Sequence, residues 1–147
     1  IEIQPNLADS HSNLGSILKD LGKLEEAELS TRKAIQLNPD LANYHYNLGN
    51  ILQELGIFDE AKGAYAEAIK VKPDYYQAYN NLGNTLAKLG KIDDAEACYK
   101  RSIGIKNDYA EARSNSLFLN ASMRFDANVY LNDAREFADM VATWAIC

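Results

Sequence analysis

A period of 34 residues is the feature that most restricts how this chain can fold. The segment Asn47-Leu48-Gly49-Asn50 recurs as Asn81-Leu82-Gly83-Asn84, and a variant precedes it as Asn13-Leu14-Gly15-Ser16. Several other residue types keep the same step: Pro5, Pro39 and Pro73; Gly22, Gly56 and Gly90; Ala27, Ala61 and Ala95; Ile1, Ile35, Ile69 and Ile103. A fixed period across so many residue types indicates a repeat array, in which each unit packs on its neighbours.

Each unit is predicted to contain two helices. The first unit carries four apolar residues at helical spacing, Leu14, Ile17, Leu18 and Leu21. Gly22 follows at the place where a helix end favours a left-handed residue, and a second helix is expected from near Leu24 to Pro39. Three aspartates at one repeat position are predicted to cap the helix that follows each of them, Asp40, Asp74 and Asp108.

Residues 7–109 are assigned to three units, 8–41, 42–75 and 76–109. Residues 1–6 are expected to be the tail of a truncated preceding repeat, because Ile1 stands before Pro5 as Ile35 stands before Pro39. The chain is therefore expected to be a piece of a longer protein.

The period decays after Asn107, which replaces the expected proline, and Leu117 then replaces the expected glycine. Residues 110–147 are therefore predicted to form C-terminal capping helices. One is expected from Ala110 to about Ala121 and, after a loop, another from near Val129 to the C-terminus. The second has an apolar face at helical spacing, formed by Tyr130, Ala134, Phe137, Val141 and Ala145.

Composition disfavours several classes of function. The net charge of −6 argues against nucleic acid and anionic membranes as partners, because such surfaces attract clustered Lys and Arg. No apolar run approaches the roughly 20 residues that span a bilayer. Cys98 and Cys147 are too few for a disulfide framework or a cysteine-based zinc site, and we expect a cytoplasmic protein.

No cofactor, metal site or catalytic group is predicted. His11 and His45 share a repeat position, but a metal site takes about four ligands and no cysteine or third histidine joins them. Cys98 has no base near it in the sequence that would favour its thiolate. We therefore predict that the chain is not an enzyme.

The best copies of the repeat read N-L-G-x-x-L-x-x-L-G-x-x-[DE]-[DE]-A-x-x-x-Y-x-x-A-I-x-x-x-P-[DN]. This pattern resembles the tetratricopeptide repeat family over residues 1–109. The resemblance implies an all-α fold, a right-handed superhelical solenoid of antiparallel helix pairs. It also implies that the first helix of each pair lines a concave face, which usually binds peptides or protein segments.

Four asparagines form a column, one on each leading helix: Asn13, Asn47, Asn81 and Asn115. An amide side chain accepts from one backbone group and donates to another, so such a column suits an extended peptide. Four weaker candidates for peptide contact lie beside it, Tyr46, Asn50, Asn80 and Asn84. The alternative is that the asparagines bond neighbouring helices to each other.

A second resemblance concerns the residues after the array. The segment from Ala112 to Asn120, followed by Ala134-Arg135-Glu136-Phe137-Ala138, is similar to the junction of bacterial O-linked N-acetylglucosamine transferase-like proteins. In that group the asparagine column lines the concave face. The resemblance implies an alternative function, the substrate-recruiting half of a sugar transferase whose catalytic domain would lie outside these residues.

Chaperone-binding tetratricopeptide repeats grip a terminal carboxylate with Lys and Arg on the same face. The equivalent positions in this sequence carry uncharged residues, Ser12, Ser16, Tyr46 and Asn80. The resemblance therefore implies a peptide partner without that carboxylate clamp.

The N-terminal edge of the array has only six residues of a truncated repeat to cover it, although Leu7 and Leu14 make it apolar. Weak homo-oligomerisation through this edge is one expectation. The alternative is that the edge is polar enough for the chain to remain a monomer.

Overall fold

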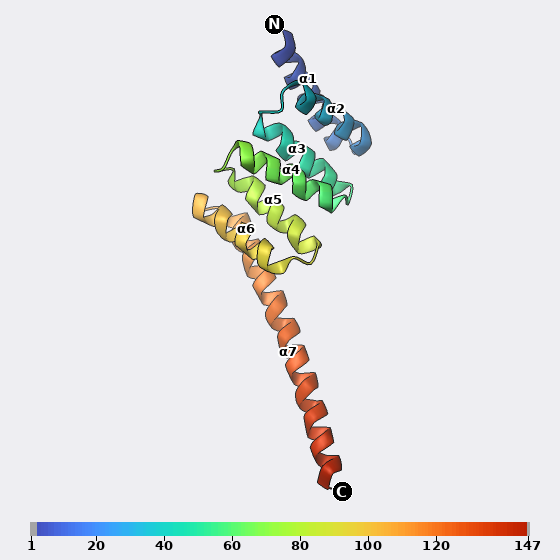
Figure 1. The fold of residues 1–147 in the computed structure, drawn as a ribbon, viewed down its shortest axis with the longest axis vertical. Coiled ribbons are helices and arrows are strands. Elements are labelled where there is room, and N and C mark those ends of the chain that lie inside the picture. Colours follow the sequence, from blue (N-terminus) through green and yellow to red (C-terminus); the bar gives the residue numbers. More distant parts are fainter. Residues whose placement is uncertain (1–2, 147) are drawn as a thin grey trace.

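The computed structural model describes residues 3–146, with the side chains in that range except those of residues 3–6, 124–127, 129–130 and 145–146. The described chain forms helices throughout, α1 (Ile3–Asp20), α2 (Leu24–Leu37), α3 (Ala42–Glu54), α4 (Phe58–Val71), α5 (Tyr76–Lys88), α6 (Ile92–Ile105) and α7 (Ala110–Ile146). Figure 1 shows three antiparallel pairs stacked in sequence order, and α7 runs away from the stack. The prediction of an all-α solenoid of helix pairs is confirmed.

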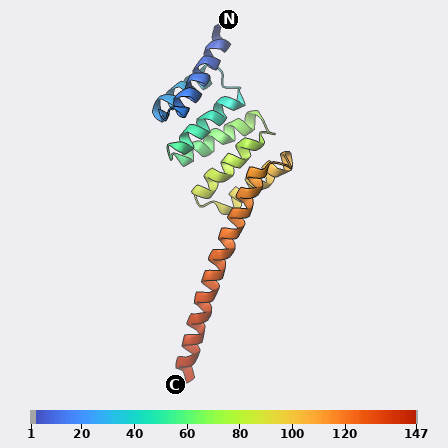
Figure 2. The same cartoon turned by 180° about the vertical axis from the view of Figure 1, so that it is seen from behind.

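Packing follows the order of the chain. Within the pairs α1 contacts α2, α3 contacts α4 and α5 contacts α6, while the second helix of each pair also contacts the first helix of the next. The view from behind in Figure 2 shows the same arrangement, with the N-terminus and the end of α7 at opposite ends of the molecule. Each first helix after α1 is therefore covered on one side by the preceding pair.

The turn inside each pair is set by a glycine. Gly22, Gly56 and Gly90 each have φ of 76°, a left-handed backbone conformation that a side chain disfavours. The prediction that these glycines end the first helices is confirmed.

Close approach within a pair depends on a second glycine. A Cβ placed on Gly49 would lie 2.5 Å from Cε1 of Tyr65, and one on Gly83 would lie 2.6 Å from the same atom of Tyr99. Both tyrosine rings are buried, together with Ala61 and Ala95. The small residues of the repeat therefore leave room for the ring that fills the core of each pair.

The predicted aspartate caps are wrong for the two helices where the cap geometry is described. The N-cap residues of α3 and α5 are Leu41 and Tyr75, and neither helix start has a side-chain capping bond. Asp40 and Asp74 thus stand one residue too early to cap. The Asp40 backbone N–H instead donates to Oδ1 of Asn38 at 3.3 Å.

The two ends of the chain differ from expectation. Helix α1 is already helical at Ile3, so residues 3–6 continue the first helix and are not a separate tail. Pro5 is tolerated there because the first turn of a helix has no internal acceptor for its N–H groups. At the other end α7 is one helix of 37 residues without the expected loop, and residues 121–129 contain neither Gly nor Pro to break it. No helix in the described range is both long and apolar enough to cross a membrane.

Candidate functional site

Two adjoining hollows follow the first helices of the pairs. One, of about 390 Å³, is lined by Lys19, Asn50, Gln53, Glu54 and Asn81. The other, of about 500 Å³, is lined by Gln53, Asn84, Ala87, Lys88, Ile92, Tyr99, Asn115, Phe118 and Leu119. Gln53 belongs to both, so they form one track from α1 across α3 and α5 to α7, which we call the inner groove.

The centre of the inner groove is a network of amides and tyrosines. Asn81 Nδ2 donates to Oδ1 of Asn50 at 2.9 Å and to the Tyr46 hydroxyl at 3.1 Å, which joins α5 to α3. The Tyr65 hydroxyl lies 2.7 Å from Oδ1 of Asn50 and 2.8 Å from Oε1 of Gln53. Burial, and then the neighbouring Tyr46, raises the pKa of Tyr65, so its hydroxyl stays a donor at neutral pH.

The C-terminal part of the column is also bonded. Asn115 Nδ2 donates to Oδ1 of Asn80 at 3.0 Å, and Asn80 Nδ2 donates to Oε1 of Glu111 at 3.2 Å. Asn80 was predicted to contact peptide, but it is fully buried, has no exposed atom to offer, and instead holds Asn115. Asn84 lines the groove, and its Oδ1 accepts from the Tyr99 hydroxyl at 2.7 Å.

Asn13 and Asn47 are arranged differently. Asn13 is exposed and Asn47 is half-buried, and neither side chain has a hydrogen-bond partner among the described residues. Asn81 and Asn115 therefore follow the alternative, in which the asparagines join neighbouring helices to each other. The amides of Asn13 and Asn47 keep both donor and acceptor available.

Sequence reasoning missed several groove residues, Gln53, Glu54, Lys88 and Phe118. Helical spacing would have found them. Each lies three or four residues after a candidate asparagine on the same helix, and residues at that spacing share one face of the helix. Lys19 Nζ lies 3.4 Å from Oε1 of Glu54 and 3.5 Å from Oδ1 of Asp20. Its charge is thereby balanced at the α1 end of the groove.

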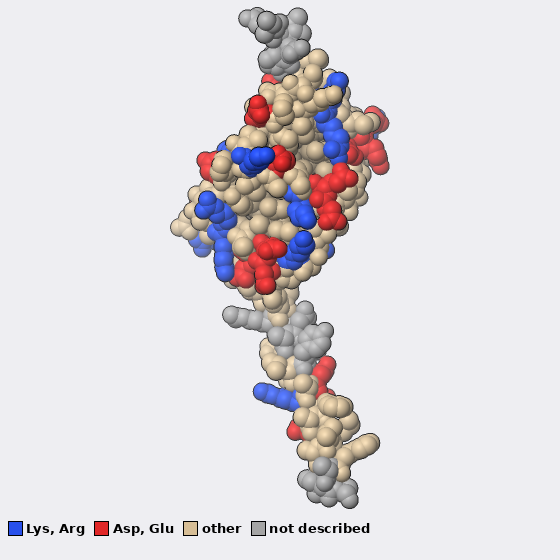
Figure 3. Space-filling view, in the orientation of Figure 1, with Lys and Arg blue, Asp and Glu red and all other residues tan. Residues whose placement is uncertain are grey.

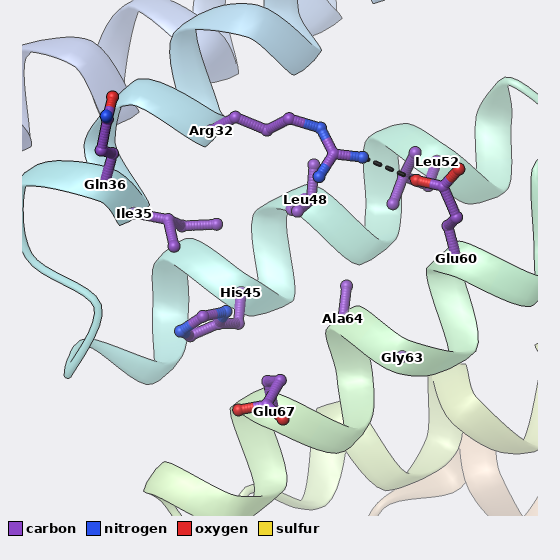
Figure 4. Close-up of a pocket in the computed structure, with 10 residues that line it drawn as sticks. All are labelled: Arg32, Ile35, Gln36, His45, Leu48, Leu52, Glu60, Gly63, Ala64 and Glu67. Carbon is purple, nitrogen blue, oxygen red and sulfur yellow. Dashed lines mark hydrogen bonds and ion pairs between the residues drawn. The ribbon is translucent and has the colours of Figure 1, made fainter.

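A separate pocket of about 450 Å³ lies on the other side of α3, between α2 and α4 (Figure 4). Its apolar wall comes from Ile35, Leu48, Leu52 and Ala64. Arg32 closes one side through a 2.7 Å ion pair with Glu60 and a 2.8 Å pair with Glu28. The bond to Glu28 raises the pKa of Arg32, so this closure is not sensitive to physiological pH.

The histidines do not form a shared site. His45 is largely buried, and its Nε2 lies 2.7 Å from the carbonyl oxygen of Pro39. Across the described part of the chain, no group of three or more His, Cys, Asp or Glu side chains is placed to hold a metal ion.

The Cys98 thiol lies in a setting that disfavours the thiolate. Burial and then Asp94 raise its pKa to about 11. In a Cys147→Ser variant, alkylation of Cys98 at pH 8 is therefore expected to be about 100-fold slower than that of an unperturbed thiol, because the thiolate fraction falls tenfold per pKa unit. Timed reaction with iodoacetamide, followed by mass spectrometry, measures this. A rate equal to that of a cysteine-containing reference peptide would contradict the effect of burial.

Comparison with known proteins gives two matching family models. One, described as TPR repeat, matches residues 15–56, and one described as tetratricopeptide repeat matches residues 46–111. Among curated proteins none matches the chain.

Solved structures share the fold. The TPR domain of Arabidopsis OM64 has a TM-score of 0.79 at 18% identity, over 81% of this chain and 98% of that one. The first TPR domain of human RPAP3, determined by NMR, has a TM-score of 0.80 at 21% identity, over 84% and 98%. The first TPR of Spaghetti (RPAP3) bound to the HSP90 peptide SRMEEVD has a TM-score of 0.78 at 20% identity, over 81% and 94%. The two family matches overlap and the fold agrees with them, so residues 15–111 of this chain belong to the tetratricopeptide repeat family.

Proposed function

We propose that this chain is a non-catalytic interaction module that binds an extended peptide or protein segment along the first helices, over Asn13 and Asn47 and the inner groove beside them. The observation that carries the proposal is the pair of unpartnered amides of Asn13 and Asn47, one repeat apart on α1 and α3. Each offers a donor and an acceptor, the two groups that a peptide backbone presents. The solved RPAP3 structure with an HSP90 peptide supports peptide binding by this fold.

The spacing of the two amides fits an extended chain. Helices α1 and α3 are in contact, and packed helices lie about 8 to 10 Å apart. A strand advances about 3.3 Å per residue, so one repeat corresponds to about three residues of peptide. We therefore propose that Asn13 and Asn47 hold backbone groups three residues apart, with Asn50 and Asn81 completing the floor.

The charges of the array fit a neutral or mixed-charge peptide. Acidic and basic side chains are interspersed over the face shown in Figure 3. In the groove Lys19 is paired with Glu54, and Lys88 is exposed. A backbone grip through amides tolerates many peptide side chains, so we propose recognition by shape and main chain more than by charge.

Replacing Asn13 or Asn47 by alanine is expected to weaken binding of a peptide selected by phage display by about 2- to 13-fold. One net hydrogen bond contributes about 0.5 to 1.5 kcal/mol, which corresponds to that range. Isothermal titration measures the affinity, and circular dichroism checks that helicity is unchanged.

Asn128→Ala is the matched control for these two variants, because Asn128 is exposed on α7 and lies neither on α1 or α3 nor among the residues that line the inner groove. Its affinity should equal that of the unmodified chain. Unchanged affinity in both Asn13→Ala and Asn47→Ala would contradict the proposed peptide contacts.

A second candidate is recruitment of substrate to an O-GlcNAc transferase-like domain. The segment from Ala112 to Asn120 favours it, because α7 carries that segment and leads out of the array. A nucleotide-sugar domain encoded directly after residue 147 would support this candidate, and an unrelated domain or a stop codon there would contradict it.

A further inference from the structure

The pocket of about 450 Å³ between α2, α3 and α4, which we call the outer pocket, has no part in the inner groove. It lies between helices of two successive units, so neither end of the chain creates it. Gly63 helps to keep it open, because no atom lies within 4 Å of a Cβ placed there. The residues at the same repeat position in α2 and α6 are Leu29 and Ala97. The second unit therefore has space where the other two units carry a side chain.

A buried ring that lines the outer pocket has one unused nitrogen. His45 is only 9% exposed, and its Nε2 lies 2.7 Å from the carbonyl oxygen of Pro39. A carbonyl oxygen only accepts, so Nε2 is the donor, and in the neutral ring Nδ1 is left as an acceptor. Nδ1 has no hydrogen-bond partner among the described residues. A buried acceptor of this kind favours a ligand that brings a donor.

A carboxylate lies at the same end of the outer pocket. Figure 4 shows His45 and Glu67 at one end, and the ion pair of Arg32 with Glu60 at the other. Glu67 is exposed and has no ion-pair partner among the described residues. Arg32, the one cation that lines the outer pocket, is already held by Glu28 at 2.8 Å and Glu60 at 2.7 Å. The end with His45 and Glu67 therefore favours a cation that carries N–H donors.

The following unit shows which cation the repeat geometry accommodates at this position. One period after His45 and Glu67 come Tyr79 and Arg101. The guanidinium carbon of Arg101 lies 6.0 Å from the centre of the Tyr79 ring, a cation–π contact. In the first unit the position of Glu67 is taken by another base, Lys33. The third unit thus supplies its own guanidinium beside this ring position, whereas the second unit has an acid there and supplies none.

We propose that the outer pocket receives an arginine side chain from a partner protein. The guanidinium donates to the Glu67 carboxylate and to Nδ1 of His45, and the aliphatic stem lies along the apolar wall that includes Leu48. Arginine fits better than lysine, because its planar head directs several N–H donors at once and is less strongly hydrated. The net charge of −6 on the chain adds attraction for a basic partner surface.

The openness of the outer pocket favours a protein partner over a small molecule. Five of the residues that line it are exposed, Arg32, Gln36, Glu60, Gly63 and Glu67. Small-molecule sites enclose most of their ligand, whereas an anchor residue needs only to be covered by the surface that presents it. The partner is expected to bind independently of a peptide over Asn13 and Asn47, because the outer pocket lies on the other side of α3.

Blocked amino acids test the outer pocket with one side chain at a time. The probes are the N-acetyl, N-methylamide derivatives of arginine and citrulline, because citrulline has nearly the same shape without the charge. Backbone amide shifts in ¹H–¹⁵N spectra of the 147-residue chain measure both affinities. The arginine probe should shift the amides of His45, Gly63 and Glu67. It should bind about tenfold more tightly than the citrulline probe, because its hydrogen bond to the carboxylate is charge-assisted.

Two variants separate charge from space in the outer pocket. Glu67→Gln should weaken the arginine probe about tenfold and leave the citrulline probe unchanged, so that the two probes bind equally. Gly63→Leu should remove binding of both probes by filling the pocket, and it should stay folded because leucine favours the helix and meets no atom within 4 Å at its Cβ. Glu26→Gln is the matched control, an exposed carboxylate on α2 that does not line the outer pocket. Circular dichroism checks the helicity of all three.

Each other outcome overturns the proposal. An arginine probe that gives no saturable shift, or that binds no more tightly than the citrulline probe, shows that the outer pocket does not recognise a guanidinium. Equal binding of the corresponding lysine derivative shows that any cation suffices. Binding of the arginine probe that persists in Gly63→Leu, or that weakens equally in Glu26→Gln, lies outside the outer pocket.

Discussion

Replacing Tyr65 by alanine is expected to lower the free energy of unfolding by about 3 to 5 kcal/mol. The Tyr65 ring has no exposed surface and packs with Leu48, Leu52 and Ala61 in the core of the second pair. The side chains around it come from two helices that are held by their own turns, so they close only part of the cavity. The loss therefore includes both the buried area and the residual void.

Tyr65→Phe separates the ring from its hydroxyl. The ring remains in the core, while Asn50 and Gln53 lose the donor that lies 2.7 and 2.8 Å from them. We expect a loss of about 0.5 to 1.5 kcal/mol, because both amides lie at the groove and are partly solvated. In this variant Asn50 keeps the bond that it accepts from Asn81 Nδ2 at 2.9 Å.

Urea unfolding followed by circular dichroism measures both effects. Phe118→Ala is the control, because this aromatic side chain is 76% exposed and its loss should change stability by less than about 0.5 kcal/mol. A Tyr65→Ala chain within 1 kcal/mol of the unmodified one would mean that the ring does not support the core of the second pair.

The repeat units and their turns were predictable because short stretches of sequence determine them. Gly22, Gly56 and Gly90 adopt the left-handed conformation wherever a helix must stop within a few residues of the next one. The straight course of α7 differs from the expected loop, because decay of the repeat does not by itself end a helix. Local helix preference, with no Gly or Pro in residues 121–129, prevails there.

The candidate site was predicted as a column of equivalent asparagines. The asparagine side chains differ in their hydrogen bonds, and the repeat position alone does not predict that difference. Asn81 bonds Tyr46 and Asn50 of the preceding unit. One period earlier, Ser12 and Ser16 take the positions of Tyr46 and Asn50. Their side chains are too short to bond Asn47 in the same way. Ser16 instead donates to the carbonyl oxygen of Ser12 at 3.2 Å. Whether each asparagine amide is hydrogen-bonded to the preceding unit thus depends on the length of the side chains in that unit.

Gly63→Ala is expected to stabilise the chain and Gly49→Ala to leave its stability unchanged or lower it, with a difference between the two variants of about 1 to 3 kcal/mol. Both glycines lie inside helices, so both replacements gain the same helix propensity, about 1 kcal/mol. At Gly63 nothing lies within 4 Å of the new Cβ, and the gain remains.

At Gly49 the new Cβ would lie 2.5, 2.7 and 2.8 Å from three atoms of the Tyr65 ring. That ring is buried on all sides and is not the flexible end of a side chain, so the helices of the pair must separate to admit the methyl group. The steric cost equals or exceeds the propensity gain, which makes Gly49→Ala neutral to destabilising while Gly63→Ala is stabilising.

Thermal and urea unfolding of the two variants test the argument directly. Because propensity cancels in the comparison, the difference in unfolding free energy between them reports the contact with Tyr65 alone. In a Tyr65→Ala background this difference should shrink toward zero, since the ring that the methyl group meets is gone. Two variants of equal stability in the unmodified background would show that the two helices of the pair separate freely to admit the methyl group.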